Sequence, residues 1–388
     1  MTINQPTIHR RRLRTAVGVL FFMAGLSFSS WTSRIPTIQH NLNLSYAAWG
    51  AVLFALPVGL MCSLPFSGWI ITKIGSKRLL LGAILLYGIT LLAIGLAQTP
   101  FQLIACLLVY GFAGNAANIS VNTQAVATEG LYSKPIMASF HGLWSLGGFT
   151  GAGIGAFMIS HEIGTFHHFV LILAVLITGV IIFSQNLYND TDSIKKTTEP
   201  RLSFRAIVKL FIPLLTLGTI AFCSMICEGA MFDWSGIYFK NVILAPPARL
   251  GFGFAAFMCT MALGRFVADK FADRFGLKRT LQLSGILTVT GLLIAVVFPY
   301  FFTAIIGFLL VGAGVCSVVP MVYSVAGKSK TMSPGVAITV VSTIGFIGFL
   351  VGPPVIGFIA SIATLRASFI FIALMGAGVV AIATKAKL

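Results

Sequence analysis

The sequence predicts an all-α membrane protein with twelve transmembrane helices in two six-helix parallel repeats. Three observations carry this prediction. Hydrophobic residues make up 57% of the chain and charged residues only 9%, whereas a soluble domain carries roughly 25% charged residues. Apolar runs recur at the ~20-residue length that a helix needs to cross a hydrocarbon core. Loops with the same glycine and basic residues recur about 200 positions apart.

The apolar runs divide into six on each side of one long polar stretch, YNDTDSIKKTTEPR at 188–201. The first run follows the basic segment HRRRLR but lacks a small-x-small cleavage site, so we expect a retained helix rather than a signal peptide. The predicted spans of the first half are 14–37, 46–71, 79–98, 101–127, 136–160 and 166–186. Those of the second half are 207–232, 250–268, 279–298, 301–325, 334–361 and 364–384.

These spans define an N-terminal half (1–187), a cytoplasmic linker (188–206) and a C-terminal half (207–388). An even number of spans puts both termini on one side of the membrane. With that side taken as the cytoplasm, cytoplasmic segments hold all but five of the 26 Lys and Arg residues. Such a bias is typical of cytoplasmic loops, so we expect a multi-pass protein of the cell inner membrane with cytoplasmic termini. The five exceptions are Arg34, Lys240, Arg249, Arg265 and Arg366.

Two loops match between the halves. GSKR at 75–78 aligns with GLKR at 276–279 at an offset of 201, and Trp31 aligns with Trp234 at an offset of 203. Parallel six-helix repeats with related loops on one face describe a known transporter architecture. The repeat therefore favours a secondary transporter that works by alternating access.

At these motifs the sequence resembles the major facilitator superfamily over essentially its full length. DKFADRFGLKR (269–279) fits the loop signature of the family, and GFIGFLVGPPVIGF resembles its penultimate helix. EGAMFDWSGIYFK (228–240) and SFHGLWSLGG (139–148) resemble the YbjJ-like branch, near the fucose permeases. The resemblance implies the major facilitator fold and transport of a small-molecule substrate.

Ionisable residues within membrane helices are candidates for function because burying charge in lipid is costly. Glu228 is expected in the outer half of its helix, with Asp233 and Trp234 within about a turn and a half. We predict that Glu228 and Asp233 couple transport to protons. Two alternatives remain open: an ion pair that locks the outer gate, with Arg34 as partner, and simple exposure at the outer surface.

This sequence also departs from the pattern of the fucose permeases. The fucose permeases use carboxylates in helices 1 and 4, but alignment on Pro36 puts Thr32 at the first position. At the second position stands Gly114 or Asn115. Proton coupling in this chain is therefore expected to involve the seventh helix.

Polar residues on the cavity-lining helices of the family are predicted to bind substrate. Asn115, Asn118 and Asn122 share one helical face, where they could bind hydroxyl groups or hold helices together. Arg34 could equally be an interfacial anchor or a cation that meets a carboxylate or an anionic substrate. The predicted substrate-binding residues are Trp31, Arg34, Asn115, Asn118, Asn122 and Trp234.

The charged loop at 269–279 and Glu129 are predicted to gate the cytoplasmic side. Asp273 precedes a turn and could reach the start of the fifth helix near Ser133, Lys134 and Pro135, where a helix N-terminus attracts an anion. By the family resemblance, this contact would break when the carrier faces inward. The predicted gating residues are Asp269, Asp273, Arg274, Gly276, Lys278, Arg279 and Glu129.

Other function classes find little support. The net charge of +17 is accounted for by cytoplasmic loops rather than by nucleic-acid binding, and no HExxH, GxSxG or phosphate-loop motif indicates an enzyme. We expect no metal or cofactor, and a monomer in the lipid bilayer. The predicted function is proton-coupled transport of a small polar, sugar-like or hydroxylated solute. The alternative is a multidrug or metabolite exporter of the same fold.

Overall fold

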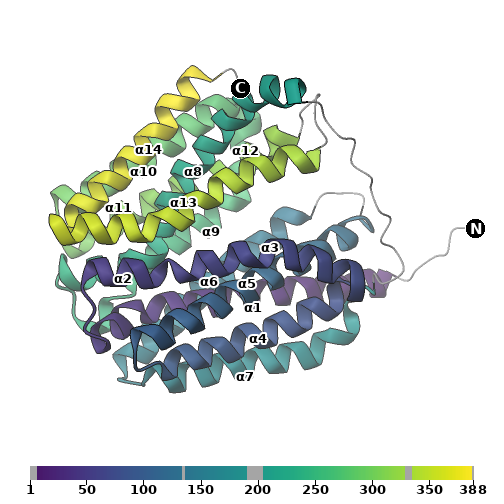
Figure 1. Cartoon of the computed structure of the whole chain (residues 1–388), viewed down its shortest axis with the longest axis horizontal. Helices are drawn as coiled ribbons and strands as arrows, with labels where there is room; N and C mark the ends of the chain where they lie inside the picture. Colours follow the sequence, from purple (N-terminus) through teal and green to yellow (C-terminus); the bar gives the residue numbers. More distant parts are fainter. Residues whose placement is uncertain (1–6, 133–135, 190–203, 328–333, 387–388) are drawn as a thin grey trace, which may run out of the picture. The chain divides into compact units, whose positions relative to one another are not determined.

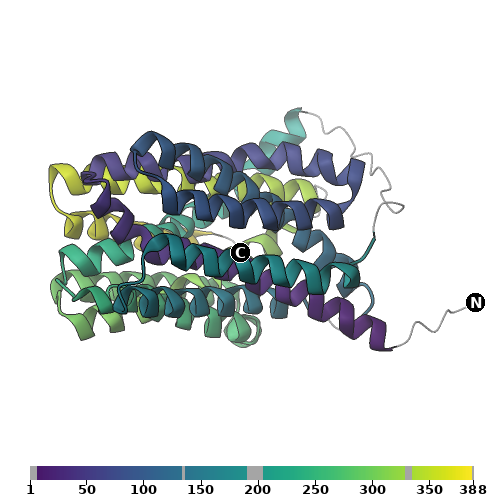
Figure 2. The same cartoon turned by 90° about the horizontal axis from the view of Figure 1, so that it is seen from below.

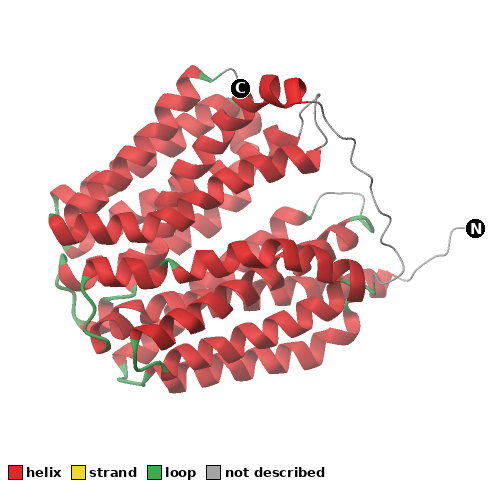
Figure 3. Ribbon diagram, in the orientation of Figure 1, coloured by secondary structure: helices red, strands yellow, loops and turns green. Residues whose placement is uncertain are grey.

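The computed structural model confirms the predicted fold class. It describes residues 7–132, 136–189, 204–327 and 334–386, apart from the side chains of 7–9, Ala138, 204–212, Asp269, Asp273, Gly327, 334–336 and Thr339. Within these ranges every regular element is a helix (Figure 3). Twelve helical spans of the described chain are long and apolar enough to cross a membrane.

The first compact unit consists of Met1–Asn43, Ala55–Lys195 and Pro247–Gly251. Its helices run lengthwise beside one another (Figure 1, Figure 2). In this unit α1 packs along α6, α5 packs along both α3 and α4, and α7 packs along α4. The helices are α1 (Thr7–Asn41), α3 (Ala55–Ile74), α4 (Ser76–Leu96), α5 (Pro100–Glu129), α6 (Met137–Ser160), α7 (Thr165–Phe183), η1 (Ser184–Asn186) and η2 (Pro247–Arg249).

The second compact unit consists of Leu44–Phe54, Lys196–Pro246 and Phe252–Leu388. Here α8 packs along α13, α11 packs along both α9 and α10, and α14 packs along α10. This is the pairing order of the first unit, as an internal repeat predicts. The helices are α2 (Tyr46–Leu53), α8 (Phe204–Asn241), α9 (Phe252–Phe275), α10 (Leu277–Val297), α11 (Phe301–Val315), α12 (Val318–Gly327), α13 (Pro334–Ile362) and α14 (Leu365–Lys385).

The two matched loops share one backbone conformation. Gly75 precedes α4 with φ 82° and ψ 160°, and Gly276 precedes α10 with φ 82° and ψ 154°. This region is open almost only to glycine. A Cβ on Gly276 would meet nothing within 4 Å, so backbone conformation rather than space explains the glycine there.

Two of the predicted spans each divide into two helices, although the backbone of Phe54 and of Cys316 stays in the αR region. The second span breaks at Phe54 between α2 and α3, and the tenth breaks at Cys316 and Ser317 between α11 and α12. A proline follows each break, Pro57 and Pro320 respectively. Proline lacks the N–H that would bond to the carbonyl four residues earlier, so the helical ladder is interrupted at Leu53 and at Cys316.

The seventh span is longer than predicted. The run Pro213–Asn241 is one candidate span, whereas the sequence prediction ends it at 232. The segment from Asp233 to Asn241 continues the helix because it contains no proline. Glu228 therefore lies further from the end of its helix than the sequence prediction placed it, although still in the half of α8 that ends at Asn241.

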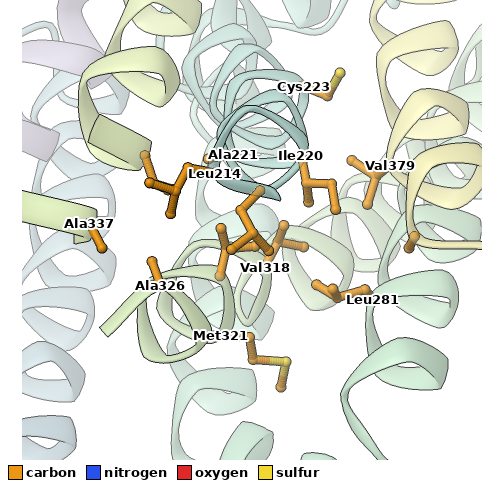
Figure 4. Close-up of a cluster of buried hydrophobic side chains, with 14 residues drawn as sticks. Leu214, Ile220, Ala221, Cys223, Leu281, Val318, Met321, Ala326, Ala337 and Val379 are labelled. Carbon is orange, nitrogen blue, oxygen red and sulfur yellow. The ribbon is translucent and has the colours of Figure 1, made fainter. Parts of the chain in front are cut away.

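Apolar packing stabilises the second unit. A cluster of buried side chains from α8, α10, α12, α13 and α14 surrounds Val318 (Figure 4). Leu214 and Ile220 of α8, Met321 of α12 and Val379 of α14 belong to this cluster. It fixes α12, the segment beyond the helix break, against the helix that carries Glu228.

Candidate transport site

Glu228 on α8 lies beside Arg265 on α9. Glu228 Oε1 is 3.5 Å from Arg265 Nη2, and the two side chains are 10% and 17% exposed. The contact joins one oxygen to one nitrogen and is longer than the 2.7–2.9 Å typical of charged hydrogen bonds. An ion pair at this depth is costly to build and points to function rather than to stability.

The break between α11 and α12 adjoins this pair. The charge of Glu228 acts electrostatically on the Cys316 thiol at the break and on the Tyr323 hydroxyl of α12. One turn before Glu228, Ser224 is 2% exposed and its hydroxyl has no hydrogen-bond partner in the described structure.

Asp233 and Trp234 occupy different environments on α8. The Asp233 carboxylate is half-buried and makes no hydrogen bond or ion pair with any described residue. Trp234 is fully buried, with its ring centroid 6.3 Å from that of Tyr46 on α2. Trp31 of α1 is also fully buried, so neither tryptophan presents surface to a solute as the helices are packed.

Arg34 is held inside the first unit. It is 3% exposed; its Nε donates to His168 Nδ1 at 3.1 Å, and Nη2 donates to the Ile163 carbonyl at 2.7 Å. An arginine Nε–H always donates, so His168 carries its proton on Nε2. That nitrogen is buried without a described partner. These contacts join α1 to α7 and to the loop before it.

The asparagine stripe of α5 divides into two parts. Asn115 is 4% exposed and donates to the Leu60 carbonyl of α3 at 3.1 Å, which is a helix-packing contact. Asn118 is exposed, and Asn122 donates to the Asn118 side-chain oxygen at 3.0 Å. Asn118 and Asn122 are the members of the stripe that are not fully buried.

Glu129, the last residue of α5, caps the next helix. Its Oε2 accepts hydrogen bonds from the backbone N–H groups of Ile136 and Met137, each at 2.7 Å. A carboxylate is stabilised at a helix N-terminus by unpaired N–H groups and by the helix dipole. The start of α6, where Asp273 was expected to bind, already holds the carboxylate of Glu129.

The predicted gating loop is described only in part. Arg274 stacks over the Phe275 ring at 5.4 Å, and Lys278 and Arg279 are exposed at the start of α10. The side chains of Asp269 and Asp273 lie outside the described residues, as do residues 133–135. The predicted latch between Asp273 and residues 133–135 stays a prediction.

Three residues that matter in the structure were not among the predicted site residues. Arg265 could have been found from the sequence, because it is a basic residue within an apolar span. The indications in the sequence that His168 and Gln124 matter were weaker than those for Arg265. Gln124 is fully buried and bonds Ser76, at the start of α4, and the backbone of Tyr188.

One cavity of the first unit and the described metal-ligand residue types do not point to another centre. A cavity of about 330 Å³ in the first unit is lined by Asn41, Thr165 and His167 among others, and it contains no predicted site residue. No group of three or more His, Cys, Asp or Glu side chains among the described residues could hold a metal ion.

Comparisons with known proteins agree on one family. The sequence profile of the Major Facilitator Superfamily matches residues 17–243 and 238–386. An uncharacterized MFS-type transporter of Yersinia pestis is 31% identical over 96% of this chain and 94% of its own. The membrane protein MosC of Rhizobium meliloti is 31% identical over 93% of this chain and 87% of its own. A mutant of the nucleoside transporter NupG superposes with a TM-score of 0.77 at 14% identity, covering 96% of this chain and 99% of its own.

Proposed function

Because this chain belongs to the major facilitator superfamily, we propose that it moves a small polar, hydroxyl-bearing solute by proton-coupled alternating access. It is a multi-pass membrane transporter with twelve candidate spans, and its family and relatives are transporters rather than enzymes. The proposal places a monomer in the cell inner membrane with both termini in the cytoplasm. It also assigns the chain to the branch near the fucose permeases.

The position and burial of Glu228 are the observation that supports the proposal. Glu228 lies within a candidate membrane span and is only 7% exposed. Low access to water disfavours a charged carboxylate, and the neighbouring Arg265 favours it. The protonation state of Glu228 is therefore expected to depend on both its hydration and its contact with Arg265. Asp233 remains a second candidate for proton binding.

The polar solute is inferred from the first unit. Asn118 and Asn122 offer amide groups at the accessible part of the α5 stripe. Amides donate to and accept from hydroxyl groups, so a sugar or polyol suits them better than an apolar drug.

A multidrug or metabolite exporter is the second candidate, and one aromatic pair favours it. Phe232 of α8, one turn beyond Glu228, stacks with the partly exposed Phe349 of α13 at 6.4 Å between ring centroids. Aromatic rings of this kind suit flat apolar solutes. Efflux of fluorescent dyes from proteoliposomes, set against uptake of labelled sugars, separates the two candidates.

Transport by the purified protein in proteoliposomes tests the coupling. With a pH gradient imposed, the wild type should accumulate at least one sugar or polyol from a labelled panel. Glu228→Gln should abolish accumulation and retain counterflow exchange, because exchange needs no net proton movement. Glu162→Gln, at an exposed loop position, is the control and should accumulate solute normally. Unchanged accumulation by Glu228→Gln over a pH series would exclude Glu228 as the coupling group.

A further inference from the structure

Asp233 on α8 is a carboxylate without a counter-charge among the described residues. We propose that Asp233 is a solute-binding residue that holds a protonated amine of the transported molecule. The solute class is then a hydroxylated amine, such as an amino sugar or an amino polyol. This inference rests on the proposed function, because it takes the hydroxyl groups of the solute from that proposal and leaves the coupling proton to Glu228.

The position of Asp233 keeps its charge away from the membrane surface. Asp233 stands eight residues before Asn241, the last residue of α8, which is a rise of ~12 Å. Long Lys and Arg side chains reach the interface from within a helix, but the side chain of Asp is too short to do so. A carboxylate that stays inside a membrane span needs water or a cation beside it.

The open stripe of this part of α8 contains Asp233. From Cys223 onward, the residues before Asn241 that are not buried are Asp233, Gly236 and Lys240. Their spacing of three and four residues places them on one helical face. Asp233 and Lys240 are two turns apart, ~10 Å along the axis, and make no ion pair in the described structure. A stripe so narrow and polar does not suit lipid, so we infer that it faces water or a solute.

An aromatic ring lies beside the same part of α8. A Cβ on Gly229 would be 2.8 Å from Cδ1 of Phe349 on α13, so the Phe349 ring covers the turn before Asp233. Side chains of a helix lean toward its N-terminus, which directs the Asp233 side chain toward that turn. Phe349 is partly exposed, and its ring centroid is 6.4 Å from that of Phe346. A carboxylate and an aromatic face together attract an organic ammonium group.

The described neighbours offer Asp233 little besides a ligand. Glu228 pairs with Arg265, and the sequence of α13, which packs along α8, holds no ionisable residue. An inorganic cation fits less well than an amine, because hard metal cations collect about six oxygen ligands. Gly229 and Phe349 supply no side-chain oxygen. A protonated amine has three N–H donors, of which one can bind Asp233 while the others bind water.

Binding to the purified full-length protein tests the inference with matched amine and neutral probes. D-glucamine is compared with D-glucitol, and D-glucosamine with D-glucose, by calorimetry at neutral pH. At least one amine should bind the wild type at least ~10-fold more tightly than its neutral match, as expected for a hydrogen bond between charged groups. Asp233→Asn should lose this preference and keep the affinity of the wild type for the neutral probe, because an amide still binds hydroxyl groups.

Three further variants separate recognition from folding. Asp233→Glu, which keeps the charge, should recover part of the preference for the amine. Phe349→Leu should weaken amine binding about threefold or more and leave neutral binding unchanged, because only the amine gains from the ring face. Phe358→Leu, at a 59% exposed position of the same helix, is the matched control and should bind both probes like the wild type.

The inference is overturned if neither amine binds, if the neutral probes bind as well as the amines, or if Asp233→Asn keeps the preference for the amine. Equal losses of amine and neutral binding in Asp233→Asn would assign the carboxylate a structural role and reject the inference. Binding heat from sodium chloride, measured against potassium chloride, that disappears in Asp233→Asn would assign the site to an inorganic cation and also overturn it.

Uptake into proteoliposomes separates failure of this inference from failure of the proposed function. Uptake of D-glucitol or D-glucose that is driven by a pH gradient and abolished in Glu228→Gln would retain the proposed function and reject the amine. A preference for the amine that depends on Asp233, with uptake that does not respond to the pH gradient, would retain the amine and reject proton coupling.

Discussion

At the scale of the residue, Arg34 shows how a membrane helix can hold a cation by pairing it inside the protein. Its guanidinium is buried and donates to a histidine ring and a backbone carbonyl. Such an arrangement joins α1 to α7 and keeps the charge away from lipid. We therefore interpret Arg34 as a packing residue of the first unit, although the sequence left a substrate contact equally open.

The role of His168 is testable by substitution. His168→Leu removes the acceptor of the Arg34 Nε–H, and a hydrogen bond to a charged group is worth about 1.5–3 kcal/mol. The variant should be less stable than the wild type by that amount in thermal unfolding in detergent. His168→Gln, which restores an acceptor oxygen, should recover part of the loss. His167→Leu, at an exposed neighbouring position, should change little; equal losses at the two positions would contradict the assigned contact.

The residue types could be predicted from sequence more readily than their partners. Glu228 stands out as a carboxylate within an apolar run, but its partner lies 37 residues away on another helix, and only the fold brings them together. The asparagine stripe illustrates the same limit. The spacing of Asn115 and Asn118 places both on one face, yet the position of α3 decides that Asn115 packs while Asn118 stays accessible.

At the scale of the element, the close packing of α1 against α6 depends on glycine. Gly147, Gly151 and Gly155 recur every four residues along α6 and allow its close approach to α1. A Cβ on Gly147 would collide with the Phe22 carbonyl, and one on Gly151 would lie 2.7 Å from the Leu26 carbonyl. Because these obstacles are backbone atoms, they cannot move aside without shifting a helix.

Alanine substitution along α6 tests this packing. Gly147→Ala should destabilise the protein by about 1–3 kcal/mol or more, the usual cost of overpacking. Gly153→Ala is the matched control in the same helix, because a Cβ there meets nothing within 4 Å. It should be neutral or slightly stabilising, since alanine favours helix over glycine. Similar melting temperatures for the two variants would refute the close contact of α1 and α6.

Helices were more predictable than their interruptions. The lengths of the apolar runs alone were enough to predict all twelve spans. The breaks at Phe54 and at Cys316 were missed, although Pro57 and Pro320 gave a signal in the sequence. Proline inside a membrane helix often only bends it, as Pro36 in α1 and Pro213 in α8 leave their helices unbroken. The outcome at each proline therefore depends on the packing around it.

At the scale of the whole molecule, the internal repeat is visible in both units. Each unit pairs its helices in the same order, and each has a glycine with φ 82° at the matched loop. The sequence revealed this repeat through the GSKR and GLKR loops and through the match of Trp31 to Trp234. Substrate and coupling are less accessible to such reasoning, because one architecture serves many solutes through a few side chains.

The central claim is that Glu228 exchanges the coupling proton, and infrared difference spectroscopy of the protein in lipid tests it without knowledge of the solute. As pH is lowered, the wild type should gain a carbonyl-stretch band of a protonated carboxylic acid in a poorly hydrated site. Glu228→Gln should lack that band, whereas Asp233→Asn should retain it. If the band is unchanged in Glu228→Gln, Glu228 does not take up the proton and the account is contradicted.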